Sequence, residues 1–239
     1  ISLVALGFYI IGNAQSSNSR LPLIGEEAPS FVTKSTQGKI NFPKDFGNNW
    51  KILMAHPKDF TPVCSSEILE LAHLQEEFKK INTSILVLST DLLSQHESWK
   101  KALEEVNYKN REPVPIEFPI IDDSEYEISE KYGMIHPVED PALNVRAAFI
   151  IDPENKIRAI SFYPNEMGRN MKEIHRSVVA LQRIQENENV ATPANWQPGD
   201  HLLVPVLTKD ERNNLNNPDS EIKSLTWFMN YKPDKKLEE

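Results

Sequence analysis

Apolar runs of strand length alternate with segments of helical period between residues 51 and 188, and this alternation most constrains the fold. Residues 51–56 (KILMAH) and 84–90 (SILVLST) are nearly continuous apolar runs, typical of strands buried on both faces. Between them, apolar residues recur at spacings of three and four along one helical face: Ile68, Leu71, Leu74, Phe78 and Ile81. The chain therefore begins as a strand–helix–strand unit.

The same pattern continues toward the C-terminus. We predict a helix over residues 94–106, with Ser94 as its N-cap and Glu97 completing a capping box. The remaining expected elements are a strand in 117–123, a helix over 124–132 that stops at Gly133, a hairpin of strands 145–152 and 156–164, and a helix over 170–188. This order predicts an α/β fold in which helices cover a largely parallel sheet, and the hairpin makes the sheet mixed.

Composition limits the class of protein and its partners. The formal net charge of −9, with 26% charged and 39% hydrophobic residues, is typical of a soluble globular chain. An acidic chain is a poor ligand for nucleic acid or for an anionic membrane surface, so we expect neither as the main partner. We predict one main domain over residues 21–189, an aromatic, Pro-rich extension over residues 190–236, and a tail at residues 237–239.

The first 20 residues form a separate segment. An apolar run over residues 1–11 passes through Gly12 and Ala14 into a Ser-rich stretch, which fits a signal-peptide remnant cleaved after Ala14. The alternative is a buried N-terminal strand. The apolar run is too short to span a bilayer, so we expect no stable membrane insertion of the mature domain. A signal peptide would make the protein exported or periplasmic.

Cys64 is the single cysteine among 239 residues. These residues therefore offer no disulfide, no CxxC pair and no multi-cysteine zinc site. The six histidines are scattered without HxxxH or HExxH spacing, so we predict no metal and no cofactor.

The position of Cys64 indicates chemistry. Pro62 suits the first residue of a helix and Thr61 suits its N-cap, which places Cys64 in the first turn. Unpaired backbone N–H groups and the positive end of the helix dipole favour a thiolate there, and the thiolate is the nucleophilic form. Cys64 also precedes Ile68 by four residues and so faces the core. A buried, inert cysteine remains the alternative.

Several longer motifs accompany Cys64. The stretch HPKDFTPVC has the spacing PxxxTxxC at Pro57, Thr61 and Cys64. Arg146 lies in NVRAAFIIDP, and Arg169 lies in FYPNEMGRN. The segment VATPANWQPGD opens the extension.

In this order the motifs resemble those of the one-Cys peroxiredoxins, from about residue 23 to residue 231. The first motif also matches the one-Cys form of the signature at His56, Asp59, Phe60 and Pro62. The resemblance implies a thioredoxin-like fold and a thiol peroxidase of antioxidant defence and redox homeostasis, which reduces hydrogen peroxide and organic hydroperoxides. Members of this family are usually cytoplasmic.

The resemblance also implies roles for individual residues. Cys64 would attack the peroxide O–O bond and become a sulfenic acid, while Thr61 and Arg146 would hold the peroxide. Pro57 would shield the pocket from water. Glu67 and Arg169 would orient Arg146, and His56 would lie near the sulfur.

With one cysteine, the oxidised form needs an external reductant, either a small thiol or a thioredoxin- or glutaredoxin-like protein. We also expect a homodimer or a larger homo-oligomer, in which residues 190–233 reach over a neighbouring copy. Two other functions use the same residues: a redox-sensing or chaperone-like interaction protein, and a Cys–His acyl transferase with His56 as base.

One departure from relatives concerns a second activity. Some mammalian one-Cys peroxiredoxins are also phospholipases, with a serine in a GDSWG segment and a histidine upstream. Here the segment is GNNWK, in which Asn49 replaces that serine, and Pro43 occupies the histidine position. We therefore predict no phospholipase activity.

Overall fold

The structure, a computed structural model, describes residues 20–234 and is built on a seven-stranded sheet. The segment predicted over residues 1–20 and the tail 237–239 lie outside the described residues, apart from Arg20. The strands, in spatial order, are β2 (Gly38–Phe42), β1 (Phe31–Ser35), β5 (Ile120–Asp122), β4 (Thr83–Ser89), β3 (Trp50–Ala55), β6 (Arg146–Ile151) and β7 (Ile157–Tyr163).

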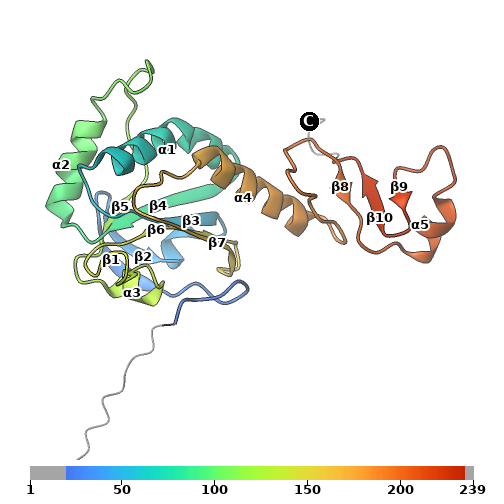
Figure 1. The fold of residues 1–239 in the computed structure, drawn as a ribbon, viewed down its shortest axis with the longest axis horizontal. Helices are drawn as coiled ribbons and strands as arrows, with labels where there is room; N and C mark the ends of the chain where they lie inside the picture. Colours follow the sequence, from blue (N-terminus) through green and yellow to red (C-terminus); the bar gives the residue numbers. More distant parts are fainter. Residues whose placement is uncertain (1–19, 235–239) are drawn as a thin grey trace, which may run out of the picture.

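The sheet is mixed, as predicted, but the expectation of a largely parallel sheet is wrong, because only two of its six neighbouring strand pairs are parallel. Strand β4 is parallel to both of its neighbours, β3 and β5, whereas β6 pairs with β3 and with β7 in antiparallel fashion. The covering helices are α1 (Pro62–Lys80), α2 (Leu93–Leu103), α3 (Glu127–Lys131) and α4 (Met171–Glu186). Figure 1 shows α1 and α4 on one side of the sheet and α3 on the other.

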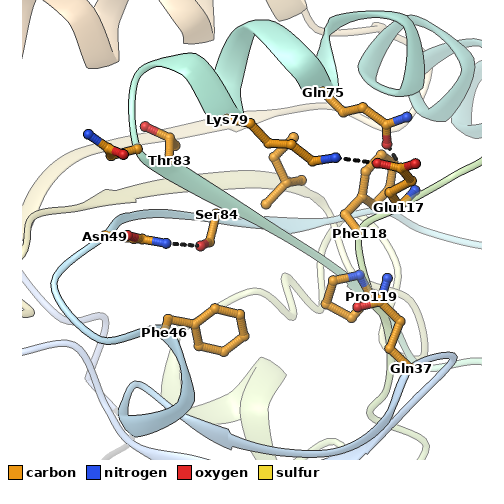
Figure 2. Close-up of a pocket in the computed structure, with 12 residues that line it drawn as sticks. Gln37, Phe46, Asn49, Gln75, Lys79, Thr83, Ser84, Glu117, Phe118 and Pro119 are labelled. Carbon is orange, nitrogen blue, oxygen red and sulfur yellow. Dashed lines mark hydrogen bonds and ion pairs between the residues drawn. The ribbon is translucent and has the colours of Figure 1, made fainter.

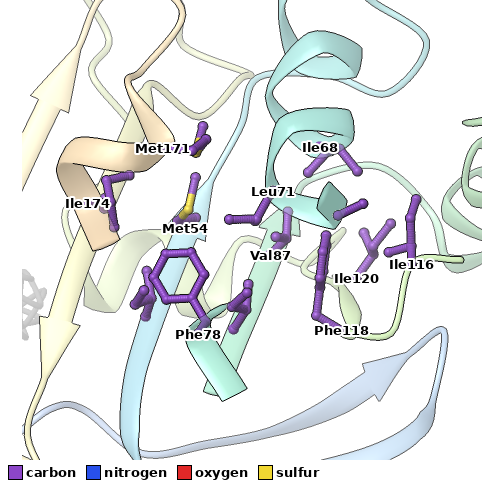
Figure 3. Close-up of a cluster of buried hydrophobic side chains, with 14 of the residues drawn as sticks. Met54, Ile68, Leu71, Phe78, Val87, Ile116, Phe118, Ile120, Met171 and Ile174 are labelled. Atoms are coloured by element: carbon purple, nitrogen blue, oxygen red, sulfur yellow. The ribbon is translucent and has the colours of Figure 1, made fainter. Parts of the chain in front are cut away.

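Alternation of side chains along the central strands creates two cores. On β3, Ile52 and Met54 point into the core beneath α1 and α4, while Leu53 and Ala55 point into the opposite core. The α1 side of the sheet also buries residues from the facing helices, including Leu71, Phe78, Met171 and Ile174 (Figure 3). Because both faces are covered, every residue of β3 is buried, which explains its continuous apolar sequence.

Two helices begin elsewhere than predicted. Helix α2 begins at Leu93, and the extended residue Leu92 occupies the N-cap position assigned to Ser94; Gln95 Oε1 accepts a hydrogen bond from the Leu92 amide at 3.3 Å. Helix α3 begins at Glu127 rather than Ser124, because the Asp123 carboxylate accepts bonds from the Ile128 and Ser129 amides and delays the first turn. The helix stops before Gly133, as expected, at a positive φ of 60°.

The hairpin of β1 and β2 was not predicted from the sequence. Ser35 pairs with Gly38 across a two-residue turn, and Gly38 has a φ of +95° that favours glycine. A short 3-10 helix, η1 (Lys44–Phe46), follows. Polar residues such as Lys34, Lys39 and Asn41 interrupt the apolar pattern here, because this pair of strands lies at the edge of the sheet.

The C-terminal extension forms a small lobe beyond the end of α4 (Figure 1). It holds an antiparallel sheet of β8 (Leu202–Leu203), β10 (Met229–Lys232) and β9 (Lys223–Thr226), with the short helix α5 (Lys209–Asn214). Val190, Trp196 and Leu202 pack with Ala180 of α4 and attach the lobe to the main domain. Among residues 20–234, no helix has the length and apolar character needed to cross a membrane.

Candidate active site

Cys64 lies where the sequence places it, in the first turn of α1. The helix begins at Pro62, and Thr61 takes the extended N-cap conformation (φ −103°, ψ 148°). The Cys64 side chain faces the core beneath the helix and is 1% exposed. The sulfur is therefore held at the positive end of a 19-residue helix and away from bulk water.

Thr61 is the N-cap residue, as predicted, but its side chain makes no capping hydrogen bond to the helix. Its Oγ1 donates a hydrogen bond to the Lys58 carbonyl at 2.9 Å, and the Ser65 amide donates to the Thr61 carbonyl at 2.9 Å. The Thr61 hydroxyl thus directs its proton to the loop and keeps its oxygen lone pairs as acceptors.

The loop between β3 and α1 is fixed by buried residues. Pro57 is buried, and the Asp59 amide donates to Asp91 Oδ2 at 2.7 Å. Phe60 has a φ of +56°, a left-handed conformation that is costly for an aromatic residue, and its ring is exposed. Such strain is typical of loops whose geometry is set by function.

Arg146 reaches Cys64 from a distant part of the sequence. It is the first residue of β6, two positions before Ala148, and by alternation it points into the same core as Cys64. Its Nη1 lies 3.3 Å from Cys64 Sγ and 2.9 Å from Glu67 Oε2. Its Nε and Nη2 both donate to the Asn165 carbonyl, at 2.9 and 2.6 Å. The guanidinium is thus fixed from three directions.

Glu67 joins Arg146 to Arg169. Oε1 of Glu67 accepts from the Arg169 amide at 2.7 Å and from Arg169 Nε at 2.9 Å, and Oε2 accepts from Arg169 Nη2 at 2.7 Å. Arg169 Nη1 also donates to the Ala147 carbonyl. Burial would raise the pKa of Glu67, but the hydrogen bonds and charge of Arg169 and the charge of Arg146 outweigh it and lower that pKa.

The charges in this cluster do not cancel. Two guanidinium groups and one carboxylate, all buried, leave one positive charge beside the sulfur of Cys64. A buried positive charge attracts an anionic sulfur and an oxygen that gains negative charge during a reaction. The arrangement suits nucleophilic attack by sulfur with charge developing on a leaving oxygen.

His56 lies in a second, adjoining polar cluster. Its Nε2 is 2.9 Å from Asp59 Oδ1, and its ring lies 5.0 Å from that of Trp99, whose Nε1 donates to Ser65 Oγ. No bond joins its other nitrogen, Nδ1, to any described residue. His56 is therefore placed beside the first turn of α1, one contact away from the residue that follows Cys64.

Donor atoms of His56, Asp59 and Asp91 lie within 4.8 Å of one another, close enough for a metal ion. Hydrogen bonds already use these atoms: Asp59 pairs with His56, and Asp91 Oδ2 accepts from the Asp59 amide and from Ser89 Oγ. We therefore assign no metal to this cluster.

Some residues of the site were missed in the sequence. Asn165 acts through its backbone carbonyl, which every residue type possesses, so no sequence pattern could single it out. His96 bonds Asp59 from α2, and its burial gave a weak signal because it lies three residues before the buried Trp99. The predicted set of Cys64, Arg146, Glu67 and Arg169 is brought together as one cluster.

Comparisons with known proteins agree with this site. Residues 24–160 match the AhpC/TSA family, and residues 180–215 match the C-terminal domain of 1-Cys peroxiredoxin. The chain belongs to the one-Cys peroxiredoxins. A peroxiredoxin of Methanosarcina mazei is 46% identical over 217 residues, which cover 90% of this chain and 99% of the relative. A 1-Cys peroxiredoxin of Dictyostelium discoideum is 40% identical over 188 residues, covering 79% and 76%.

Solved structures of peroxiredoxins share the fold. A yeast mitochondrial 1-Cys peroxiredoxin superposes with a TM-score of 0.78 at 34% identity, over 90% of this chain and all of that chain. A Cys-to-Ser mutant of peroxiredoxin 6 from Arenicola marina gives 0.78 at 35% identity, over 90% and 99%. Like its family, this peroxiredoxin is a thiol-dependent peroxidase with a thioredoxin-like fold.

A pocket of about 290 Å³ elsewhere in the peroxiredoxin contains the position of the phospholipase serine (Figure 2). Asn49 occupies it and donates from Nδ2 to Ser84 Oγ at 3.1 Å, and Lys79 and Glu117, which also line the pocket, form an ion pair. The pocket lining contains no histidine to activate a hydroxyl. The predicted absence of phospholipase activity stays a prediction.

Proposed function

We propose that Cys64 is the nucleophile of this peroxidase and that Arg146 stabilises the charge it generates. The observation that carries the proposal is the 3.3 Å contact between Arg146 Nη1 and Cys64 Sγ in the first turn of α1. An arginine stays charged at any working pH, and its Nη1 is already directed at the sulfur.

The reaction proceeds by attack of the Cys64 thiolate on one oxygen of a peroxide. A sulfur–oxygen bond forms as the O–O bond breaks, so the sulfur is oxidised to a sulfenic acid. The other oxygen leaves with the bonding electrons and takes a proton to become water or an alcohol. Arg146 offers N–H donors where the negative charge develops, and the Thr61 hydroxyl oxygen remains free to accept from the peroxide.

The neighbouring residues support this geometry. Glu67 and Arg169 hold Arg146 in place, because Glu67 contacts both guanidinium groups and Arg169 is anchored to the backbone of β6. Pro57 is buried next to His56 and helps to keep water from the sulfur. These contacts pre-organise the site before peroxide binds.

An external thiol completes the cycle. The sulfenic acid of Cys64 condenses with one thiol to a mixed disulfide and water, and a second thiol then releases the Cys64 thiol and takes up the disulfide. The yeast relative is described as resolving its thiol through glutathione and thioredoxin systems. We propose a reductant of this kind here, because Cys64 has no second cysteine in the chain.

We also propose that the protein works as a homodimer or larger homo-oligomer. Residues 21–189 would form the peroxidase domain and residues 190–236 the dimerisation extension. The extension exposes a patch that includes Leu225, Trp227 and Phe228, with the Trp227 side chain 88% exposed. A monomer rarely leaves such an aromatic patch in water, and a second copy is the expected cover.

The test combines stoichiometry with a matched pair of arginine variants. Reduced protein mixed with one equivalent of hydrogen peroxide should lose its thiol and gain one oxygen atom by intact mass, and Cys64→Ser should gain no oxygen. Arg146→Lys should slow oxidation by about 10²- to 10³-fold. Arg158→Lys is the control, since Arg158 bonds Asp152 at the far end of β6 and β7. An unoxidised thiol in the wild-type protein would end the proposal.

A further inference from the structure

A pocket of about 450 Å³ lies where the start of α4 meets α1 and the loop that follows α2. We call it the basic pocket, because its charged lining residues are Glu70, Lys109, Arg111, Arg169 and Lys172. Four cations and one carboxylate thus gather in a chain whose formal net charge is −9. Such a concentration of positive charge on an acidic protein favours an anionic ligand.

The loop after α2 presents two of these cations on a tight turn. The Arg111 amide donates to the Tyr108 carbonyl at 3.1 Å, and the two residues between them, Lys109 and Asn110, have φ angles of 56° and 57°. Two successive left-handed residues are typical of turns built from asparagine and glycine, so the left-handed conformation of Lys109 is costly. Backbone strain of this kind is common at functional sites.

Tyr108 and Glu70 hold both cations in place. The Arg111 guanidinium carbon lies 5.6 Å from the centre of the Tyr108 ring and Lys109 Nζ lies 5.2 Å from it, while Tyr108 packs against the core beneath α1. Glu70 accepts from Lys109 Nζ at 2.7 Å and from Arg111 Nη1 at 3.1 Å. The cations are therefore positioned before a ligand arrives, which lowers the entropic cost of binding it.

One carboxylate does not satisfy the cations of the basic pocket. Arg111 Nη2 is buried and lies 3.0 Å from Glu70 Oε1, but it makes no hydrogen bond to a described residue. Lys172 is exposed at the start of α4 and has no ion-pair partner among residues 20–234. These N–H donors remain available, and a carboxylate is the acceptor that a guanidinium and an ammonium group bind most strongly.

The basic pocket adjoins the peroxidase site. Arg169 lines the pocket and also donates to Glu67, which contacts Arg146 beside Cys64. Glu70 follows Cys64 by six positions on α1, which corresponds to about 9 Å along the helix axis. Three extended residues span roughly 10 Å, so a ligand of tripeptide size has the length to extend from the basic pocket to the first turn of α1.

We propose that the basic pocket binds the carboxylates of a small acidic thiol, which serves as the external reductant of Cys64. This inference rests on the proposed role of Cys64 and gives its reductant a docking site. Hydrogen peroxide is uncharged and gains nothing from such a pocket. A thiol with free carboxylates is repelled by the acidic chain as a whole, so local cations are needed to concentrate it beside α1.

The chemical step is the one that the reductant must perform in any case. The thiol sulfur attacks the sulfenic acid of Cys64, and a sulfur–sulfur bond forms as the sulfur–oxygen bond breaks. The hydroxyl group leaves with the thiol proton as water. The basic pocket takes no part in this exchange of bonds, and its contribution is to hold the acidic thiol nearby.

Binding is tested without chemistry in Cys64→Ser protein. Titration with S-methylglutathione, whose sulfur is blocked, should give saturable shifts of the backbone amide NMR signals of the basic pocket. Lys109→Gln combined with Lys172→Gln should weaken this binding about tenfold. Lys34→Gln combined with Lys39→Gln removes the same charge from the β1–β2 hairpin and should leave the binding unchanged. The absence of saturable shifts would overturn the proposal.

Kinetics then assign the ligand to the reductant. Protein oxidised with one equivalent of hydrogen peroxide is mixed with glutathione or with glutathione diethyl ester, whose carboxylates are blocked. Per thiolate, glutathione should reduce the sulfenic acid about tenfold faster than the ester does, and Lys109→Gln combined with Lys172→Gln should abolish this preference. Equal rates for the two thiols in the wild-type protein would refute the docking site.

Fatty-acid hydroperoxides also carry a carboxylate, so oxidation of Cys64 by linoleic acid hydroperoxide is compared with oxidation by its methyl ester. If the double lysine variant slows only the reaction with the acid and keeps the preference for glutathione, the assignment to the reductant is wrong. Failure of wild-type Cys64 to react with any peroxide would instead contradict the proposed function, so the two failures are distinguishable.

Discussion

At the scale of the residue, Glu67 is the acceptor on which the active site depends. Its two oxygens take hydrogen bonds from both buried arginines. Removing one partner of a buried ion pair leaves an uncompensated charge, which costs more than losing the attraction alone. Glu67 therefore stabilises the fold and the position of Arg146 at the same time.

We expect Glu67→Gln to lower the free energy of unfolding by about 3–5 kcal/mol at pH 7. The folded pKa of Glu67 lies below its ordinary value of 4.5, so its stabilising effect is fully present above pH 4.5 and is lost as pH falls through the folded pKa. The stability gap between variant and wild type should therefore narrow below pH 4.5. Urea denaturation across pH measures this gap.

Glu70→Gln is the matched control for Glu67. Glu70 lies one turn later on α1 and pairs with Lys109 and Arg111 near the surface. Exposed pairs contribute roughly 0–1 kcal/mol, so this variant should lose little stability. An equal loss for both variants would contradict the special position of Glu67.

At the same scale, Asn49 is the residue behind the predicted absence of phospholipase activity. Its amide lacks a nucleophilic oxygen, and it is hydrogen-bonded to Ser84 in the pocket of Figure 2. We expect no fatty-acid release from phosphatidylcholine vesicles at pH 4 to 7, measured with a radiolabelled acyl chain. Phospholipid hydrolysis that co-purifies with the protein would contradict the predicted absence of phospholipase activity. If that hydrolysis is lost in Ser84→Ala, Ser84 is the residue responsible; if it persists, another residue is.

At the scale of the element, the N-termini of helices α1 and α4 position the residues of the active site. Helix α1 presents Cys64 in its first turn, and α4 begins directly after its N-cap Asn170, the residue that follows Arg169. The Asn170 Oδ1 accepts a hydrogen bond from the Glu173 amide at 3.1 Å. The cap thus fixes the helix next to the arginine that holds Glu67.

We expect Asn170→Ala to lower the free energy of unfolding by about 1 kcal/mol, because it removes this cap. Ser94→Ala should have almost no effect, since Ser94 lies inside the first turn of α2 and Leu92 takes the N-cap position. Chemical denaturation of both variants provides the comparison. The reverse order of stabilities would show that Ser94 is the true cap of α2.

At the scale of the whole molecule, residues 20–234 form a compact domain and a lobe that extends from it (Figure 1). The aromatic residues of the lobe are divided: Trp196 is buried against α4, whereas Trp227 and Phe228 stack edge to face on the β9–β10 turn and are exposed. The inner group attaches the lobe, and the outer group is available to a second copy.

We expect Trp227→Ser combined with Phe228→Ser to weaken self-association at least tenfold, measured by analytical ultracentrifugation over a micromolar concentration series. The melting temperature of the main domain should change little, because these side chains belong to neither of its two cores. Val138→Ser is the control, since Val138 is fully exposed on the main domain. A wild-type monomer throughout the series would refute the proposed dimer.

Local patterns in the sequence were sufficient to predict the central strands and helices. Strand β3 and the face of α1 follow from side-chain periodicity, which depends only on nearby residues. The start of α1 follows from Pro62, and this local signal alone places Cys64 in the first turn. The β1–β2 hairpin and the start of α3 escaped prediction, because edge position and the Asp123 hydrogen bonds do not alter apolar periodicity.

The mixed α/β sheet, the helix that carries Cys64 and the presence of a single cysteine can all be predicted from the amino-acid sequence. The contacts between polar groups are visible only in the folded chain: Arg146 meets Cys64, 82 positions away, and His96 meets Asp59. Those contacts depend on the register of β3 with β6 and on the packing of α2 against the sheet. Both are set by how side chains fill the two cores, and local sequence patterns carry no information about that packing.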